Sequence, residues 1–291
     1  MSLPFGELPG WIGSHCHEPR QGLITGTGWS DDIVLQQHFE EEARYSFVES
    51  GLASAAVPGH PKMFRLGRWA GVPVVISHGR LHFNEVCGPL GWQPHLLRQW
   101  LAILIKAMGG GRRLIITNLV GANLPEIKRG MLTFPTQLVT GGLGLSHHPW
   151  LDVTQGEFVA PESLLPCRAI DDPNRFLHAA ISAASQAELD WHNGACRYLM
   201  IGGAGFGGIG DRYLYQRLGV HTVGMSVLPE LGLVCVYNQS RDPADPPLRV
   251  GVAQLVSDNE DEPTHDGNQD IARAQAPKLG LFLSHLLQAD W

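Results

Sequence analysis

The chain has 291 residues, of which 44% are hydrophobic, and a formal net charge of -7 at pH 7. This size suits one large α/β domain or two smaller ones around a sizeable core, and the acidic balance lacks the clustered Lys and Arg that nucleic-acid binding requires. The N-terminal sequence has no signal-peptide pattern, and no run approaches the roughly 18 apolar residues of a membrane span, so we expect a cytoplasmic protein without membrane contact.

Potential metal ligands occur early in the chain, because His15-Cys16-His17 combines two residue types that bind zinc. A zinc site needs about four converging ligands, however, and none follows at suitable spacing. His147-His148 is isolated in the same way. The five cysteines are odd in number, scattered and without a C-x-x-C pair, which favours reduced thiols over a disulfide framework. We therefore expect no metal site.

The first predicted strand, Gly22–Thr25, runs straight into the turn Gly26-Thr27-Gly28. Such a turn either simply ends the strand or directs backbone N–H groups toward an anion. The next segment, Leu35–Ser50, fits a short helix or a mixed connection. It is followed by a turn at Val57–His60, in which the histidine is either a ligand or a polar turn residue.

Polar residues stand just past the ends of the next two predicted strands. Arg80 and His82 follow the strand Val72–Ser77, and Asn118 follows the strand Leu114–Thr117, where the chain turns. Open α/β sheets place their ligands at such strand ends. A guanidinium can bind two oxygens of an anion, and an imidazole adds a tunable donor. A surface salt bridge is the alternative interpretation of Arg80 and His82.

The helix between these strands, Pro94–Met108, has an apolar stripe at helical spacing and a glycine stop, so we assign it to packing. Met131–Thr140 is the next predicted strand, and Gly141–Val159 is a loop region. Asp172-Pro173 begins another helix, with Asp as the N-cap and Pro at the first helical position.

A glycine-rich sequence, Gly203–Gly208, follows the predicted strand Arg197–Ile201 and precedes a helix over Ile209–Leu218. It has the G-x-G-x-x-G spacing of a dinucleotide-binding turn, and Glu230 lies roughly where an acid would bind the ribose. This fingerprint comes late in the chain and leaves Arg80 unexplained. A dinucleotide-dependent oxidoreductase is therefore an alternative rather than the leading hypothesis.

The last predicted elements are strands over Val220–Ser226 and Leu248–Ser257 and a helix over Ile271–Leu287. The acidic stretch after the second of these strands is either a solvated loop or part of a site at the strand end, which makes Asp258 and His265 site candidates. No internal repeat, long linker or composition break divides the chain, so we favour one domain.

Five motifs, in this order along the chain, resemble those of the trimeric purine nucleoside phosphorylase and methylthioadenosine phosphorylase family. They are Gly26-Thr27-Gly28, Val57-Pro58-Gly59-His60, His78-Gly79-Arg80-Leu81-His82, Thr117-Asn118 through Gly121, and Val223-Gly224-Met225-Ser226 with Pro229-Glu230. The resemblance implies one three-layer α/β/α domain over residues 1–291, in which residues 1–20 are an N-terminal extension and the central sheet is mixed and partly barrel-like. It also implies a homotrimer.

The resemblance further implies a phosphorolytic enzyme. Inorganic phosphate would cleave the N-glycosidic bond of a purine nucleoside, or of a nucleoside like 5′-methylthioadenosine, and give the free base and a pentose 1-phosphate. Phosphate would be the co-substrate, and neither a metal nor an organic cofactor would be needed.

The same resemblance assigns residues to the two substrates. The phosphate-binding residues would be Thr27, His60, Arg80, His82, Ser226 and the backbone N–H of Leu119. The nucleoside-binding residues would be Asn84, Asn118, Phe206, Gly207, Val223, Met225, Asp258 and His265. Met225 would pack against the sugar and Phe206 against the base. His82, Asp258 and His265 are the catalytic candidates.

The chain departs from the family pattern around the base and the sugar. Members specific for 6-oxopurines typically have a Glu at the position of Gly207 and an Asn at the position of Asp258. Near the sugar, Asn84 stands in place of a Tyr, and Leu119 in place of a small residue. Asp at position 258 resembles the enzymes that use 6-aminopurines. These changes leave the preferred base open, and they motivate a further alternative, a catalytically quiet nucleoside-binding protein with the same fold.

Overall fold

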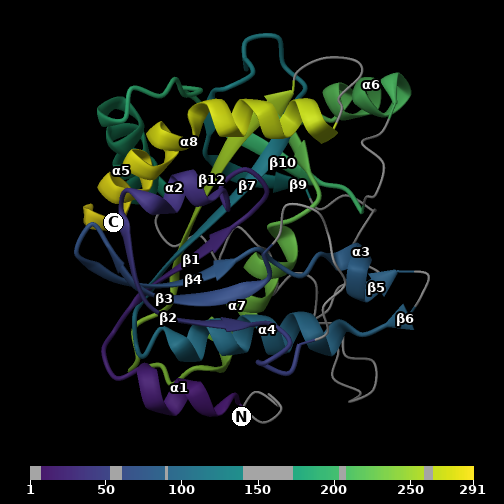
Figure 1. The fold of residues 1–291 in the computed structure, drawn as a ribbon. Coiled ribbons are helices and arrows are strands. Elements are labelled where there is room, and N and C mark those ends of the chain that lie inside the picture. The colour runs from purple at the N-terminus through teal and green to yellow at the C-terminus, as the bar shows by residue number, and fades with distance from the viewer. Residues whose placement is uncertain (1–7, 53–60, 89–90, 140–172, 203–207, 259–264) are drawn as a thin grey trace.

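The computed structural model describes residues 8–52, 61–88, 91–139, 173–202, 208–258 and 265–291 (Figure 1). Its helices are α1 (Gly10–His15), α2 (Asp32–Gln36), α3 (Phe83–Val86), α4 (Pro94–Ala107), α5 (Pro173–Gln186), α6 (Ile209–Arg217), α7 (Leu228–Ser240) and α8 (His265–Gln288). The strands of its main sheet are β1 (Gln21–Thr25), β2 (Phe39–Ser46), β3 (Met63–Trp69), β4 (Val72–His78), β7 (Arg113–Ala122), β8 (Leu132–Thr133), β9 (Pro135–Val139), β10 (Cys196–Met200), β11 (Thr222–Gly224) and β12 (Arg249–Asp258). β5 (Cys87–Gly88) and β6 (Gly91–Trp92) form a separate short pair.

The main sheet is mixed and open. Its described strands follow the order β2-β3-β4-β1-β7-β11-β10-β9, and β12 pairs with β7 and β8 beside this path. The strands β4, β1, β7 and β12 run parallel to one another, so their carboxyl ends point to the same edge. β2 and β3 extend the sheet beyond β4 as antiparallel strands.

Helices cover both faces of this sheet (Figure 1). The side chains of α1, α4 and α7 share one buried cluster, and those of α2, α5 and α8 share another. Successive residues of the buried strands alternate between the two: Ile24 faces the first cluster and Leu23 the second, and in β7 Ile116 and Ile115 do the same. The predicted three-layer α/β/α class with a mixed sheet is confirmed, and the sheet does not close into a barrel along the described strands.

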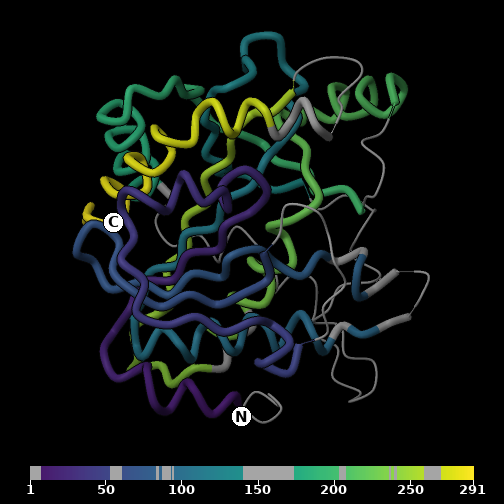
Figure 2. The backbone as a smooth tube through the Cα atoms, viewed as in Figure 1, coloured from purple at the N-terminus to yellow at the C-terminus, as the bar shows by residue number. Residues whose placement is uncertain are grey.

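The backbone trace shows how the chain ends are distributed over the layers (Figure 2). The N-terminal helix α1 lies on the same side as α4, and the C-terminal helix α8 crosses the opposite face. Among the described residues no helix is long and apolar enough to cross a membrane. That residues 1–291 form one domain with an N-terminal extension stays a prediction.

Some predicted elements differ from the structure. The strand predicted over Met131–Thr140 is divided into β8, which pairs with β12, and β9, which pairs with β10, and the last helix begins at His265. The segment Leu35–Ser50 contains the end of α2 and then the strand β2, because the acidic sequence of β2 pairs with β3 along an outer edge of the sheet. The strand predicted to end at Thr117 continues as β7 to Ala122, because β12 and β11 extend its pairing. Asn118 and Gly121 therefore lie inside a strand and not in a turn.

Several sequence predictions concern residues that lie outside the described ranges. They are the turn at Val57–His60, the loop at Gly141–Val159, the N-cap Asp172 and most of the glycine-rich sequence Gly203–Gly208.

Candidate active site

A fork in the sheet along β7 gives the candidate site its position. On one side β7 pairs with β12 along almost its whole length. On the other side it pairs with β1 over Leu114–Ile116 and with β11 at Gly121 and Ala122, and within the described residues no strand covers the segment 117–120 between them. Backbone groups at this fork need other partners, because unpaired buried polar groups are costly. The Trp29 indole meets one need, since its N–H donates to the Asn118 carbonyl at 3.1 Å.

Arg80 follows β4 and supplies a second partner at the fork. Its side chain is 1% exposed. One terminal nitrogen donates to the Thr117 carbonyl, and the other donates to Glu230 Oε1 of α7 at 2.9 Å. Burial lowers the pKa of Arg80 against the opposing effect of the Glu230 charge, but an arginine stays cationic in proteins. The Nε–H is buried without a hydrogen-bond partner in the described part of the chain.

The contacts of Arg80 bear on two alternatives from the sequence analysis, a surface salt bridge at Arg80 and a dinucleotide-dependent oxidoreductase. The predicted alternative of a surface salt bridge is wrong for Arg80, because the Arg80–Glu230 pair is buried on both sides, with 1% and 2% exposure. Glu230 is the acid that a dinucleotide site would use to bind ribose. Since that carboxylate holds Arg80, the structure gives the oxidoreductase alternative no ribose ligand at this position.

The strand β11 and the turn after it form another wall of the fork. The Tyr198 hydroxyl of β10 donates to the Ser226 carbonyl at 2.6 Å, and burial raises the pKa of Tyr198. The side-chain amide of Asn118 lies beside this hydroxyl and makes no hydrogen bond of standard geometry among the described residues. Ser226 is buried, and Val223 and Met225 are half-buried against a small cluster around β10.

The turn after β1 also reaches the fork. The Gly26 N–H donates to Thr117 Oγ1 at 3.3 Å, and a Cβ on Gly26 would lie 2.8 Å from the Thr117 carbonyl oxygen and 3.0 Å from an Arg80 nitrogen. Only glycine allows this close approach. Thr27, next in the chain, is half-buried. The side chain of Leu119 packs toward Gly28 and the α8 layer.

His82 lies beside a buried ion pair that the sequence analysis did not identify. Its backbone N–H donates to Glu85 Oε2 at 2.8 Å, and its Nδ1 lies 3.7 Å from the same oxygen. The other Glu85 oxygen accepts from Lys62 Nζ at 2.9 Å. Only the three-residue spacing of His82 and Glu85 gave a signal in the sequence, because Lys62 lies 23 positions before Glu85, just ahead of β3.

Asp258 ends β12 close to Gly121 of β7, where a Cβ would lie 3.1 Å from its carboxylate. Its Oδ1 lies 3.6 Å from an Arg212 nitrogen of α6, and both side chains are largely buried. Sequence reasoning also missed Arg212, because its partner lies in a different element.

The remaining predicted site residues are placed only in part. Asn84 lies in α3 and His265 is the first residue of α8, as far as the backbone defines them. His60, Phe206 and Gly207 lie outside the described residues. Fold and register thus bring Thr27, Arg80, Asn118 and Ser226 to one region, with His82 and Asp258 at its borders. Their roles toward a ligand stay predictions.

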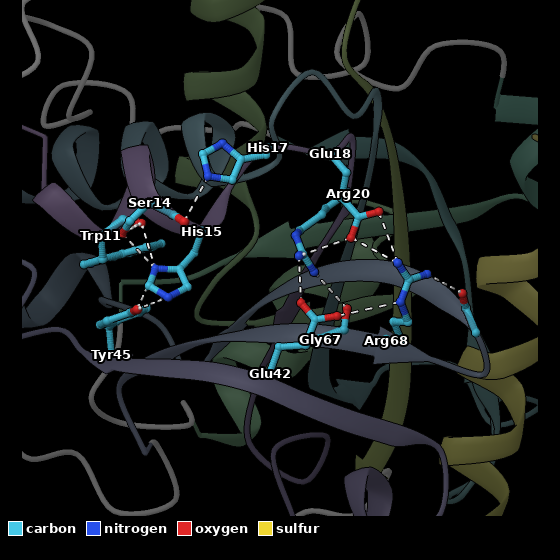
Figure 3. Close-up of polar contacts among 11 residues, drawn as sticks. Trp11, Ser14, His15, His17, Glu18, Arg20, Glu42, Tyr45, Gly67 and Arg68 are labelled. Carbon is cyan, nitrogen blue, oxygen red and sulfur yellow. Dashed lines mark hydrogen bonds and ion pairs between the residues drawn. The ribbon is translucent and has the colours of Figure 1, made fainter.

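The N-terminal segment carries two histidines, of which His15 lies against Tyr45 of β2, and a separate charge network at the amino end of β1 (Figure 3). His15 Nδ1 lies 2.8 Å from the Ser14 hydroxyl and 3.0 Å from that of Tyr45, and His17 Nε2 lies 3.0 Å from the Ser14 carbonyl. Arg20, just before β1, binds Glu42 at 2.7 Å and the Gly67 carbonyl at 3.1 Å. These contacts link the N-terminal segment to β2 and β3.

Comparison with known proteins gives the fold a class. No family model matches the chain. A purine nucleoside phosphorylase of Schistosoma mansoni, isoform 2, in complex with cytosine and ribose-1-phosphate superposes with a TM-score of 0.73 over 92% of this chain and 90% of that one, at 22% identity. The enzyme of the same organism in complex with inosine gives a TM-score of 0.72 over 96% of both chains, at 17% identity. The chain is therefore an α/β protein with the purine nucleoside phosphorylase fold.

Curated sequences agree with this class. The chain is 22% identical to the purine nucleoside phosphorylase of Anopheles gambiae over 279 residues, which are 93% of this chain and 72% of that protein. It is 24% identical to purine nucleoside phosphorylase 1 of Bacillus subtilis over 242 residues, which are 79% of this chain and 83% of that protein. The resemblance to the nucleoside phosphorylase family, predicted from the motifs, is confirmed.

Proposed function

We propose that the protein is a purine nucleoside phosphorylase-like pentosyltransferase. Phosphate attacks the anomeric carbon of a nucleoside, the N-glycosidic bond breaks, and the products are a free base and a pentose 1-phosphate. The observation that carries the proposal is a buried cation at a fork of the sheet: Arg80 is held by Glu230 and keeps one buried N–H without a partner among the described residues. The relatives named purine nucleoside phosphorylase support the same reaction.

The chemistry requires an anion site below the sugar. Phosphate is both the nucleophile and the counter-charge of a sugar that becomes cationic in the transition state, so pre-positioned donors must hold a dianion. In this proposal the donors are Thr27, His60, Arg80, His82, Ser226 and the backbone N–H of Leu119. The reaction uses inorganic phosphate as its co-substrate, without a metal or an organic cofactor.

The nucleoside binds across the fork in this proposal. Met225 and Val223 pack against the sugar and Phe206 against the base, with Asn84, Asn118 and Gly207 completing the pocket. Asp258 meets the base, and Arg212 at 3.6 Å holds its carboxylate in place. An ionised carboxylate only accepts hydrogen bonds, which favours a base with an exocyclic amino group. His265 lies near the sugar 5′ position. A homotrimer completes the proposal and rests on the family resemblance. The cytoplasmic location stays a prediction from the sequence.

A panel of nucleosides tests the function. Inosine, guanosine, adenosine and 5′-methylthioadenosine are incubated with the purified protein, with and without inorganic phosphate, and base and pentose 1-phosphate are measured. We expect base release that requires phosphate and yields pentose 1-phosphate in equal amount. Release without phosphate would indicate hydrolysis and contradict the proposal. The mass in solution tests the trimer.

A catalytically quiet nucleoside-binding protein is the second candidate. The observation that favours it is the pairing of Arg80, because two terminal nitrogens of the guanidinium already bind Glu230 and Thr117. This candidate predicts nucleoside binding, measured by calorimetry, without base release for any member of the panel.

A further inference from the structure

A buried lysine lies next to the candidate anion site and is not among the residues that the site was expected to use. The Lys62 side chain is 4% exposed. Lysine is almost never fully buried unless it is paired, and here Nζ donates to Glu85 Oε1 at 2.9 Å. The Lys62 backbone has a φ of 53°, a left-handed conformation that favours glycine. A lysine with a strained backbone and a buried charge therefore occupies this position.

The sheet register explains how Lys62 reaches the site. β3 runs antiparallel to β4, and Met63, the first residue of β3, pairs with His78, the last residue of β4. Lys62 therefore lies at the edge where the chain leaves β4 toward Arg80 and His82. Its carbonyl accepts from the Phe47 N–H at 2.9 Å, which ties the lysine to the end of the β2 segment.

Glu85 connects this lysine to His82. Its carboxylate is 8% exposed and bridges Lys62 Nζ on one oxygen and the His82 N–H on the other, with His82 Nδ1 3.7 Å away. Burial raises the pKa of Glu85, but the contacts with His82 and Lys62 outweigh it and hold the pKa below its usual range. The carboxylate is therefore ionised. This carboxylate lies beside Nδ1 and orients the His82 ring by charge.

We infer that Lys62 is a positioning residue of the anion site: its ammonium holds Glu85, and Glu85 holds the His82 backbone and imidazole in the orientation that binds phosphate. The inference rests on the proposed function, in which His82 contacts phosphate. Without the ammonium, Glu85 would be a buried carboxylate without its lysine counter-charge, which must take up a proton or move, and either change weakens its hold on His82.

The Lys62→Met variant tests this role. Met keeps most of the side-chain volume and removes the charge. Phosphate affinity is measured by calorimetry on the full-length protein, and KM is measured separately for phosphate and for the nucleoside. We expect the Kd and the KM for phosphate to rise about tenfold or more, because removing a residue that holds a ligand-binding side chain in place commonly weakens binding by this factor. The KM for the nucleoside should not change. A merely structural role would not separate the two KM values.

Two further variants keep the test decisive. Lys62→Met/Glu85→Gln removes both buried charges and is expected to fold where the single variant does not, because no unpaired charge remains. It should also lose phosphate affinity, since a neutral amide does not hold His82 as the carboxylate does. Arg20→Met is the matched control: it removes a cation that is 5% exposed and paired with Glu42 at the opposite end of the sheet (Figure 3). It should lose stability and keep wild-type phosphate affinity.

The outcomes separate the inference from the function. If the wild type binds phosphate and cleaves nucleosides while both Lys62 variants bind phosphate with wild-type affinity, the inference is overturned and the function stands. If the wild type binds phosphate but releases no base from any nucleoside of the panel, the proposed reaction fails. If the Lys62 variants then lose phosphate affinity, the positioning role still holds. If the wild type does not bind phosphate, both are overturned.

Discussion

Arg80 shows how a single side chain can be fixed by parts of the chain that are far apart in sequence. Glu230 lies 150 positions from it and Thr117 lies 37 positions away, and each binds one terminal nitrogen of the guanidinium. A buried ion pair stabilises a protein little by itself, but breaking it leaves an uncompensated charge. The pair therefore fixes the direction of the guanidinium, and the Nε–H has no partner in the described residues. In the proposed function this N–H is the donor that phosphate would use.

Removing the Arg80 charge should affect both stability and activity. We expect Arg80→Met to lower the free energy of unfolding by about 3–5 kcal/mol, because Glu230 is left buried and unpaired, and to abolish phosphate-dependent base release. Urea unfolding and the nucleoside assay measure the two effects. Arg80→Met/Glu230→Gln is the control: it should regain most of the stability and none of the activity. Activity in this double variant would exclude a role of Arg80 in phosphate binding.

Base preference should depend on Asp258. Asn can donate as well as accept hydrogen bonds, so Asp258→Asn can meet the carbonyl oxygen and ring nitrogens of a 6-oxopurine that repel a carboxylate. We expect the ratio of kcat/KM for inosine to that for adenosine to rise by about tenfold or more. Arg212→Met, which removes the cation 3.6 Å from Asp258, should weaken discrimination without reversing it. An unchanged ratio in Asp258→Asn would place base recognition elsewhere.

For single residues, sequence analysis predicts the polar side chains near strand ends but not the residues that form ion pairs with them. Arg80 and His82 were recognisable because they directly follow a β-branched strand. Glu85 and Lys62 were not, because an ion pair between two elements has no signature in either one. The dinucleotide interpretation of Glu230 was reasonable by spacing, and only its contact with Arg80 removes the support for it.

At the scale of the elements, the candidate site depends on the fork of β7, where β1 pairs with its first part and β11 with its end. Where neither β1 nor β11 covers β7, the Thr117 and Asn118 carbonyls accept hydrogen bonds from the Arg80 and Trp29 side chains. Gly26 fills the narrowest part of this junction. The fork thus depends on side chains at positions where an ordinary sheet would use backbone pairing.

Adding a methyl group at the fork should disturb it. In Gly26→Ala the Cβ would lie 2.8 Å from the Thr117 carbonyl oxygen, so β1 and β7 must separate. We expect a loss of about 1–3 kcal/mol in the free energy of unfolding and weaker phosphate binding. Gly13→Ala is the matched control, because nothing lies within 4 Å of a Cβ there and Gly13 is helical. It should stabilise the protein by about 0.5–1 kcal/mol. Equal effects of the two substitutions would show that the close approach has no consequence.

Periodicity predicted some elements well and others poorly. The helix α4 and the buried strands β1 and β4 were predicted nearly to their ends, because a continuous apolar pattern marks each one. The strand β2 was missed because its sequence, FEEEARYS, is polar and partly exposed and becomes a strand only through pairing with β3. The length of β7 depends likewise on β11 and β12, which no local pattern can reveal.

At the scale of the whole molecule, the stability of the protein in acid depends on a buried histidine at the edge where β4 ends. His78 ends β4, is 2% exposed, and its Nε2 donates to the Ser30 carbonyl at 2.8 Å. Burial lowers the pKa of His78 from 6.5 to about 4, although the hydrogen bond to Ser30 opposes the change. The folded protein therefore keeps this ring neutral at pH values where the unfolded chain is already protonated.

Global stability should fall as the pH is lowered through this window. Because the pKa in the folded state is the lower one, the stabilising effect is complete above about pH 6.5 and is lost as the pH falls toward about 4. His78→Gln keeps a donor for the Ser30 carbonyl and cannot be protonated. As the pH falls through this window, we expect its free energy of unfolding to decrease by about 3 kcal/mol less than that of the wild type. Urea unfolding of both proteins at several pH values between about 7 and about 4.5 measures the difference. Groups that do not contact His78 titrate equally in both proteins, so parallel pH dependences would show that His78 takes up a proton in the folded state as readily as in the unfolded chain. Its burial would then not control acid unfolding.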